Sequence, residues 1–379
     1  MKNFQSQVCV CAASTNLICA KKPRRNGARL MKQYKRWLAV FGGCFLAAAA
    51  AVMLLTAYID PFFQYHAPLE NFPYVVDNQV NQNPGMAKHM EYDSVILGSS
   101  MTVNFNTDWF GELMGLKTLK LSYSGAFPKD QANIMDIIFQ DGRRVDAVFL
   151  GIDVITYSGG VEETKYPIPE YLYNDHVWDD VPYLLNKDVV LQYIMRPLAD
   201  PDKTDLATVY ASWWTEEYYN KQWVMHNYVP AEPAEEEADP EKFTEHIRAN
   251  MDANICPYIE ANPDTEFYVF YPPYSILYWN DVLLEKQLDA VLREYEYISE
   301  RLFSYDNVKV FFFPNQEWII CDLDRYADYS HYHPDINRYM TECFADGECA
   351  VTEENLEEEL EKMRKIVEEY DFEELFSTR

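Results

Sequence analysis

Basic side chains are scarce in this chain. Its 379 residues include 32 Lys and Arg against 61 Asp and Glu, which gives a formal net charge of −29. Nine of the basic residues lie within residues 1–36, a stretch without any acidic side chain, so the rest of the chain is more acidic still. A surface of this sign repels phosphate backbones, and we therefore expect no nucleic acid partner.

Two other kinds of pattern are missing. No spacing of Cys and His resembles a zinc site, and no glycine-rich segment resembles a phosphate-binding loop, so we expect neither a metal nor a cofactor. Four of the eight Cys lie after residue 60, and two of these, Cys343 and Cys349, flank a short turn-like segment. In an oxidising compartment this pair is consistent either with a disulfide or with two buried thiols.

Residues 37–58 contain no charged side chain and are dominated by Ala, Leu, Val and Phe. About 20 such residues cross a bilayer as a helix, so we expect a single membrane span or signal-anchor here. The basic residues that precede it predict a cytoplasmic tail over residues 1–36 and an extracytoplasmic remainder. A cleavable signal peptide is the alternative, but the apolar run is longer than usual and no clear cleavage site follows it. Residues 1–30 are consistent either with a tail or with an upstream choice of start codon.

Beyond a connector over residues 59–92, short apolar strands alternate with helical stretches. The expected strands are 94–97, 118–121, 147–150, 267–271 and 308–313, with amphipathic helices over 243–259, 282–302 and 352–379. This alternation predicts an α/β domain over residues 93–379, with a parallel five-stranded sheet covered by helices on both faces.

A long segment interrupts the alternation between the third and fourth strands. Residues 156–240 are crowded with Tyr and Trp and close with an acidic, proline-bounded run, 230–240. An insertion of this length is expected to overhang the site as a lid or subdomain. Its aromatic side chains are suited to binding sugar rings, although a small core within the insertion would use the same residues.

Two separated motifs carry the chemistry. Gly98-Ser99-Ser100 follows the first expected strand, and Asp328 and His331 lie three residues apart near the other end of the domain. A serine hydroxyl needs an imidazole base, and the imidazole needs a third group that fixes its tautomer. We therefore expect Ser100, His331 and Asp328 to form a catalytic triad beyond the carboxyl ends of the strands.

The order and spacing of these residues resemble the first and last sequence blocks of the SGNH (GDSL-like) esterases and acyltransferases. The resemblance implies a parallel sheet of five strands, and an oxyanion hole formed by the backbone N–H groups of Ser100 and Gly125 together with a Gly-x-Asn block. Asp153 stands where that block has its asparagine. A carboxylate there would repel an oxyanion, so Asp153 is either protonated or turned away, or catalysis relies on the backbone donors, or activity is weak.

The arrangement of one span and an external domain is similar to the D-alanyl transfer protein of teichoic-acid systems and to the alginate acetylation proteins. Membrane-anchored SGNH-like proteins also carry Asp-Pro-Phe after the span, as Asp60-Pro61-Phe62 does here. The resemblance implies a serine esterase or O-acyltransferase whose partner is an acylated polysaccharide of the cell envelope. A non-catalytic envelope-binding or scaffold protein on the same fold is the alternative, and Asp153 favours it. The sequence indicates no particular protein partner.

Overall fold

The computed structural model describes residues 25–201, 204–212 and 214–377, so residues 1–24 of the expected tail lie outside it. The chain divides into two compact units, Met1–Leu54 and Leu55–Arg379. Helix α1, Arg25–Ile59, includes a segment, Arg29–Ile59, that is long and apolar enough to cross a membrane. A signal sequence near an N-terminus passes the same test of length and composition. The test therefore identifies α1 as a candidate membrane span.

The second unit is a mixed α/β structure around one six-stranded sheet. The strands are β1 Ser94–Leu97, β2 Thr118–Lys120, β3 Ala147–Gly151, β4 Glu266–Tyr271, β5 Val308–Phe312 and β6 Ala350–Val351. Their order is β2-β1-β3-β4-β5-β6, with β6 antiparallel to β5 and all other pairs parallel. The expected sheet lacked this sixth strand, because two residues are too few to leave a pattern in the sequence.

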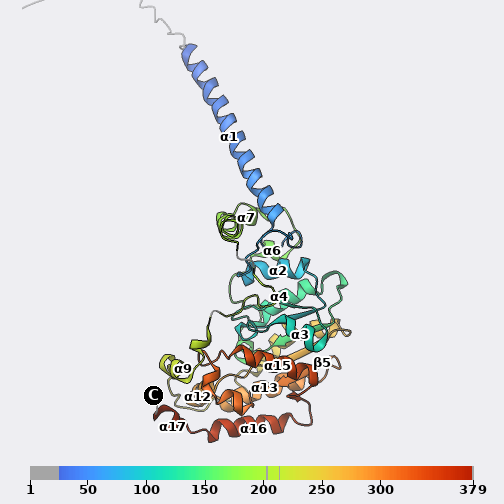
Figure 1. Ribbon diagram of the computed structural model, residues 1–379, viewed down its shortest axis with the longest axis vertical. Coiled ribbons are helices and arrows are strands. Elements are labelled where there is room, and N and C mark those ends of the chain that lie inside the picture. The colour runs from blue at the N-terminus through green and yellow to red at the C-terminus, as the bar shows by residue number, and fades with distance from the viewer. Residues whose placement is uncertain (1–24, 202–203, 213, 378–379) are drawn as a thin grey trace, which may run out of the picture. The chain divides into compact units, whose positions relative to one another are not determined.

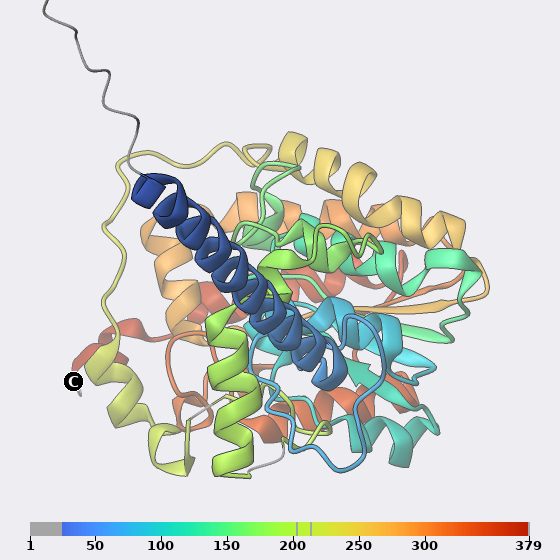
Figure 2. The same cartoon turned by 90° about the horizontal axis from the view of Figure 1, so that it is seen from above.

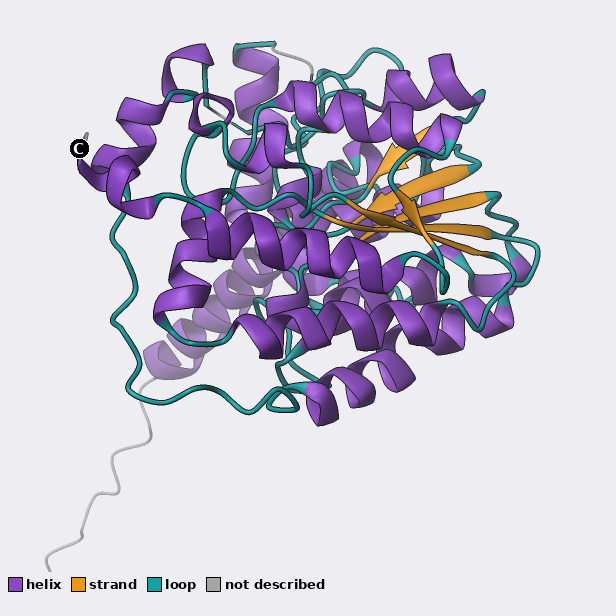
Figure 3. Cartoon of the chain, turned by 90° about the horizontal axis from the view of Figure 1, so that it is seen from below, coloured by secondary structure: helices purple, strands orange, loops and turns teal. Residues whose placement is uncertain are grey.

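Helices surround the sheet (Figures 1 and 3). Those of the second unit are α2 Gln79–His89, α3 Thr107–Met114, α4 Pro128–Ile138, α5 Val154–Tyr157, α6 Glu170–Tyr173, α7 Val181–Leu184, α8 Arg196–Ala199, α9 Lys221–Asn227, α10 Thr244–Asn250, α11 Cys256–Ala261, α12 Ile276–Leu284, α13 Leu288–Leu302, α14 Glu317–Ile320, α15 Pro334–Asp346, α16 Leu356–Glu369 and α17 Phe372–Ser377.

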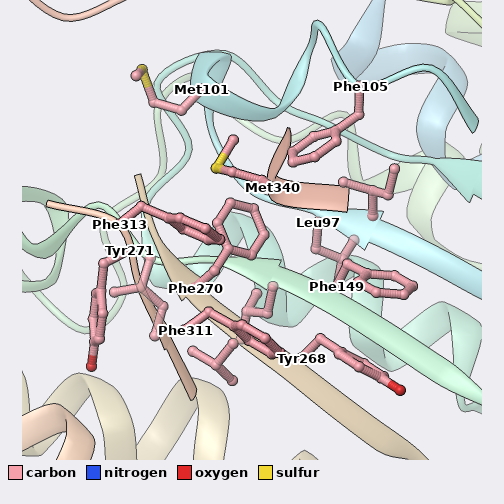
Figure 4. Packing of buried hydrophobic residues seen from close by; sticks show 14 of the residues in the cluster. Leu97, Met101, Phe105, Phe149, Tyr268, Phe270, Tyr271, Phe311, Phe313 and Met340 are labelled. Atoms are coloured by element: carbon pink, nitrogen blue, oxygen red, sulfur yellow. The ribbon is translucent and has the colours of Figure 1, made fainter. Parts of the chain in front are cut away.

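Both faces of the sheet are buried. Phe270 packs against Phe344 of α15, with ring centroids 5.2 Å apart, while its neighbour Tyr271 packs against Tyr295 of α13 at 4.9 Å. Successive side chains of a strand point to opposite faces, so α15 and α13 cover opposite sides. Figure 4 shows the α15 side, where Met340 lies among aromatic residues of neighbouring strands.

All three expected helices are interrupted. The stretch 243–259 is helical from Thr244 onward but contains a π-helical turn, Met251–Ile255, between α10 and α11, and Pro257, which lacks an N–H, follows that turn. The stretch 282–302 divides into α12 and α13, because Lys286 adopts a φ of +54° and cannot continue a right-handed helix. The expected closing helix is likewise two helices, α16 and α17.

The connector packs into the second unit. Asp60, which is fully buried, accepts hydrogen bonds from the N–H groups of Gln64, Tyr65 and His66 and from the hydroxyl of Tyr183. Helix α2 approaches so closely that a Cβ at Gly85 would lie 2.0 Å from the carbonyl oxygen of Phe62. The residues after α1 therefore form part of the same compact body as the sheet.

The insertion between β3 and β4 is built from short helices and long loops. After α9, residues 228–243 contain neither helix nor strand and cross the surface as an extended strap (Figure 2). The N–H groups of Ala234 and Ala238 bond to the carbonyls of Leu284 and Lys286, at 2.8 and 2.9 Å. These bonds hold the strap against the C-terminal end of α12.

Cys343 and Cys349 lie at the end of α15 with their sulfur atoms 3.8 Å apart, as free thiols. Both alternatives for this pair therefore stay open. The nearby helix ends at Gly347, whose φ of +83° is the left-handed conformation that glycine adopts without a Cβ clash.

Candidate active site

Ser100 lies just after β1, at the carboxyl edge of the sheet. Gly98 has a φ of +150°, and a Cβ there would lie 2.5 Å from the Thr102 methyl group, so this turn requires glycine. Ser100 then begins a three-residue 3-10 turn, Ser100–Thr102. A single turn carries little macrodipole, and α3 begins only at Thr107.

His331 bridges the two other expected residues. Its Nε2 lies 2.8 Å from Ser100 Oγ, and its Nδ1 lies 2.8 Å from Asp328 Oδ2. The backbone N–H groups of Ser330 and His331 both donate to Asp328 Oδ1, at 2.8 and 2.7 Å. The three side chains therefore form one hydrogen-bonded chain, although 231 residues separate Ser100 from His331.

The electrostatics of the site indicate which nitrogen of His331 carries the proton. Burial alone would raise the pKa of Asp328, but the hydrogen bonds and charge of His331, with the backbone donors, bring that pKa below its ordinary value. An ionised carboxylate only accepts hydrogen bonds, so Nδ1 of His331 carries the proton. Nε2 then presents its lone pair to the hydroxyl of Ser100, which is the arrangement that a general base requires.

Buried contacts brace the turn that carries Ser100. The carbonyl of Met101 accepts hydrogen bonds from Tyr332, at 2.9 Å, and from Asn337, at 3.3 Å, and so ties the turn to the His331 loop. Thr102 Oγ1 lies 2.6 Å from Ser122 Oγ, which belongs to the loop after β2. The turn of Ser100 is therefore held both by the loop after β2 and by the segment that contains Tyr332 and Asn337.

Lys120 is buried beneath this turn. Its ammonium donates to the carbonyls of Val103 and Phe105, each at 2.6 Å, and burial lowers its pKa to about 7. Lys120 was not among the residues expected at the site, because a lysine in a strand ordinarily points to solvent. Its place between Leu119 and Leu121 in a short apolar strand was the available signal in the sequence.

The insertion contributes directly to the site. The ring of Trp214 lies 4.8 Å from the imidazole of His331, between centroids. Ser212, two residues earlier, bonds through its N–H and its hydroxyl to Asn104, which follows the Ser100 turn. The insertion thus contacts both loops of the site, and Trp214 brings an aromatic ring against the expected base.

Gly125 lies in the loop after β2, next to the Ser100 turn. Its φ is +74°, and an added Cβ would lie 2.9 Å from the side chain of Lys165. Two residues earlier, the N–H of Tyr123 donates to the carbonyl of Gly98 at 2.9 Å. The two loops expected to hold an oxyanion are therefore joined at the same edge of the sheet.

Asp153 follows β3 at this edge and is buried. Its carboxyl group accepts a hydrogen bond from the hydroxyl of Tyr274 and bonds to the side chain of Ser99. Burial raises its pKa, and the two hydrogen bonds and the nearby His331 oppose that rise. Asp153 thus adjoins the Ser100 turn through Ser99, and its assignment to the oxyanion hole stays a prediction.

Within the described residues, no group of three or more His, Cys, Asp or Glu is arranged to hold a metal ion. Comparisons with protein-family models, curated proteins and solved structures found no match. The SGNH resemblance therefore rests on the short motifs alone, and the interpretation of this site rests on its geometry.

Proposed function

We propose that this protein is a serine esterase or O-acyltransferase, anchored in the membrane by α1, that acts on acyl groups of a cell-envelope glycan. The observation that carries the proposal is the hydrogen-bonded chain from Ser100 through His331 to Asp328. The SGNH-like order and spacing of these residues, the Asp-Pro-Phe after α1 and the composition of α1 support it further.

In the proposed reaction, Ser100 Oγ attacks the acyl carbonyl while its proton passes to His331 Nε2. Asp328 stabilises the imidazolium, and the N–H groups of Ser100 and Gly125 stabilise the tetrahedral oxyanion. His331 then protonates the sugar oxygen as its bond to the acyl carbon breaks, so that the sugar departs with a free hydroxyl and the acyl group remains as an ester on Ser100. Water or a second hydroxyl, activated by His331, attacks that ester and releases the acyl group by hydrolysis or transfer.

A second candidate function is that of a non-catalytic envelope-binding or scaffold protein. The observation that favours it is Asp153, a buried carboxyl group in the place of a neutral amide donor.

The proposed orientation, with residues 60–379 outside the cell, applies to both functions. Digestion of the C-terminal domain by protease added to intact cells is expected, and protection of that domain would overturn the orientation.

A fluorophosphonate probe separates the two functions, because it labels an activated serine whatever the natural substrate. We expect labelling of the parent chain at Ser100 and none after Ser100→Ala. Ser330→Ala is the matched control, since Ser330 lies within 3.2 Å of His331 Nδ1 but on the side away from Nε2. A parent chain as inert as Ser100→Ala to the probe and to a series of acyl esters would make the scaffold function the better interpretation.

A further inference from the structure

A cavity lies beside the loop that carries Asp328 and His331. It measures about 400 Å³, within the range of small-molecule sites. Its walls come from α5, α12, α13 and the strap, and from Tyr329, the neighbour of Asp328. Ser100 and His331 do not line it, so it is separate from the proposed acyl site.

Glu294 of α13 is a buried carboxyl group in the wall of this cavity. Its residue exposure is 4%, and its Oε2 has no hydrogen bond within the described part of the chain. Burial raises its pKa to about 8, with only the charge of Lys242 acting in the opposite direction. A buried carboxyl oxygen without a partner is costly, and a ligand that donates hydrogen bonds to it would offset that cost.

The rest of the wall favours a positive ligand. Asp281 of α12 and Glu285, which caps that helix one turn later, face the same cavity, and Asp281 Oδ1 is already held by the N–H of Ala231 at 2.9 Å. The rings of Phe243, Tyr278 and Tyr329 add aromatic surface, which attracts cations.

Lys242 is the basic side chain among the residues that line this cavity. Its ammonium lies 4.7 Å from the centroid of the Phe243 ring, and no ion pair joins it to Glu294 within the described residues. The remaining charge of the wall is therefore negative once Glu294 ionises.

We propose that this cavity is a binding site for a small primary ammonium compound, whose N–H groups donate to Glu294 while its charge faces Asp281 and Glu285. A primary ammonium suits the site better than a quaternary one, because only the former can satisfy Oε2. A neutral polyol would donate to Glu294 but would gain nothing from the two other carboxylates.

Binding is tested by thermal unfolding of the full chain in detergent, with Ser100→Ala as the background so that turnover plays no part. Ethylammonium chloride is added, against tetramethylammonium chloride and ethanol as probes that lack the donor or the charge. A ligand that binds only the folded state raises the unfolding temperature in a saturable way. We expect this response for ethylammonium alone.

Glu294→Gln is the deciding variant, because it keeps the shape and removes the charge. We expect it to weaken the ethylammonium response about tenfold or more, as the loss of a charge-assisted hydrogen bond would. Glu300→Gln, which removes the same charge from the exposed side of α13, should leave the response unchanged, and Lys242→Gln should strengthen it. An equal response in Glu294→Gln, a response to tetramethylammonium of the same size, or a loss of binding in Lys242→Gln would overturn the proposal. Because no turnover is measured, each outcome is independent of the proposed esterase function.

Discussion

The phenol of Tyr332 donates a 2.9 Å hydrogen bond to the carbonyl of Met101, and thereby joins the loop of His331 to the turn of Ser100. Both residues are buried. The bond lies one residue from His331 on one side and one residue from Ser100 on the other, so it helps to hold these two side chains at hydrogen-bonding distance.

Removal of that bond should weaken the hydrogen bond between Ser100 Oγ and His331 Nε2 without removing either side chain. For Tyr332→Phe we expect a rate of fluorophosphonate labelling lower by about tenfold, because small displacements of reacting groups are costly. Tyr329→Phe, which removes a phenol from the same loop on its solvent side, should label at the parent rate. Equal rates for Tyr332→Phe and the parent would show that Asn337 alone is sufficient to hold Met101.

Asp328→Asn tests the assignment of protons. An asparagine can donate its own N–H to His331 Nδ1, which would leave the proton on Nε2 and remove the base that faces Ser100. We expect labelling and ester turnover to fall by about 10³–10⁴-fold while the fold is kept, as circular dichroism would show. Asp322→Asn, in the loop just before, is the control. A loss of less than about tenfold would mean that Asp328 only supports the loop.

Asp153→Asn tests the departure from the SGNH pattern. If the carboxylate opposes the oxyanion, a neutral amide should raise turnover of a small acetyl ester. Burial raises the pKa of Asp153, so the opposing charge develops as pH rises, and the gain of the variant over the parent should grow in the same direction. Rates measured across pH on both proteins give this ratio. Reduced activity in a folded variant would instead give Asp153 an essential role of its own.

The sequence predicted the strands better than what lies between them. Runs such as Val95-Ile96-Leu97 are apolar because both faces of the sheet are covered, and that composition is visible without a structure. The break at Lys286 was not visible, because a positive φ at a residue other than glycine leaves no signal in the composition.

The same contrast holds at the site. The grouping of Ser100, Asp328 and His331 was predictable, because a serine triad uses those residue types in a recognisable order. Trp214 and Lys120 owe their positions to tertiary packing, and neither residue type indicates the active site by itself. The contact of Trp214 with His331 and the contacts of Lys120 with the residues after Ser100 appear only once the insertion and β2 are placed in three dimensions.

Glu294 should make the free energy of unfolding depend on pH, and Glu294→Gln should remove that dependence. Its pKa rises from 4.5 to about 8 on folding, so its contribution is fully present below about pH 4.5 and is lost as pH approaches 8. Lys242 faces it and reduces the effect, while Tyr278 and Tyr295, whose pKa values are raised by burial, stay neutral in this range. A pKa that differs by one between the folded and unfolded states corresponds to about 1.4 kcal/mol, so a loss on the order of a few kcal/mol is expected.

Urea unfolding at pH 5 and pH 8 should show this loss in the parent and in Glu300→Gln, and a smaller one in Glu294→Gln. The same loss in all three proteins would place the titrating group elsewhere.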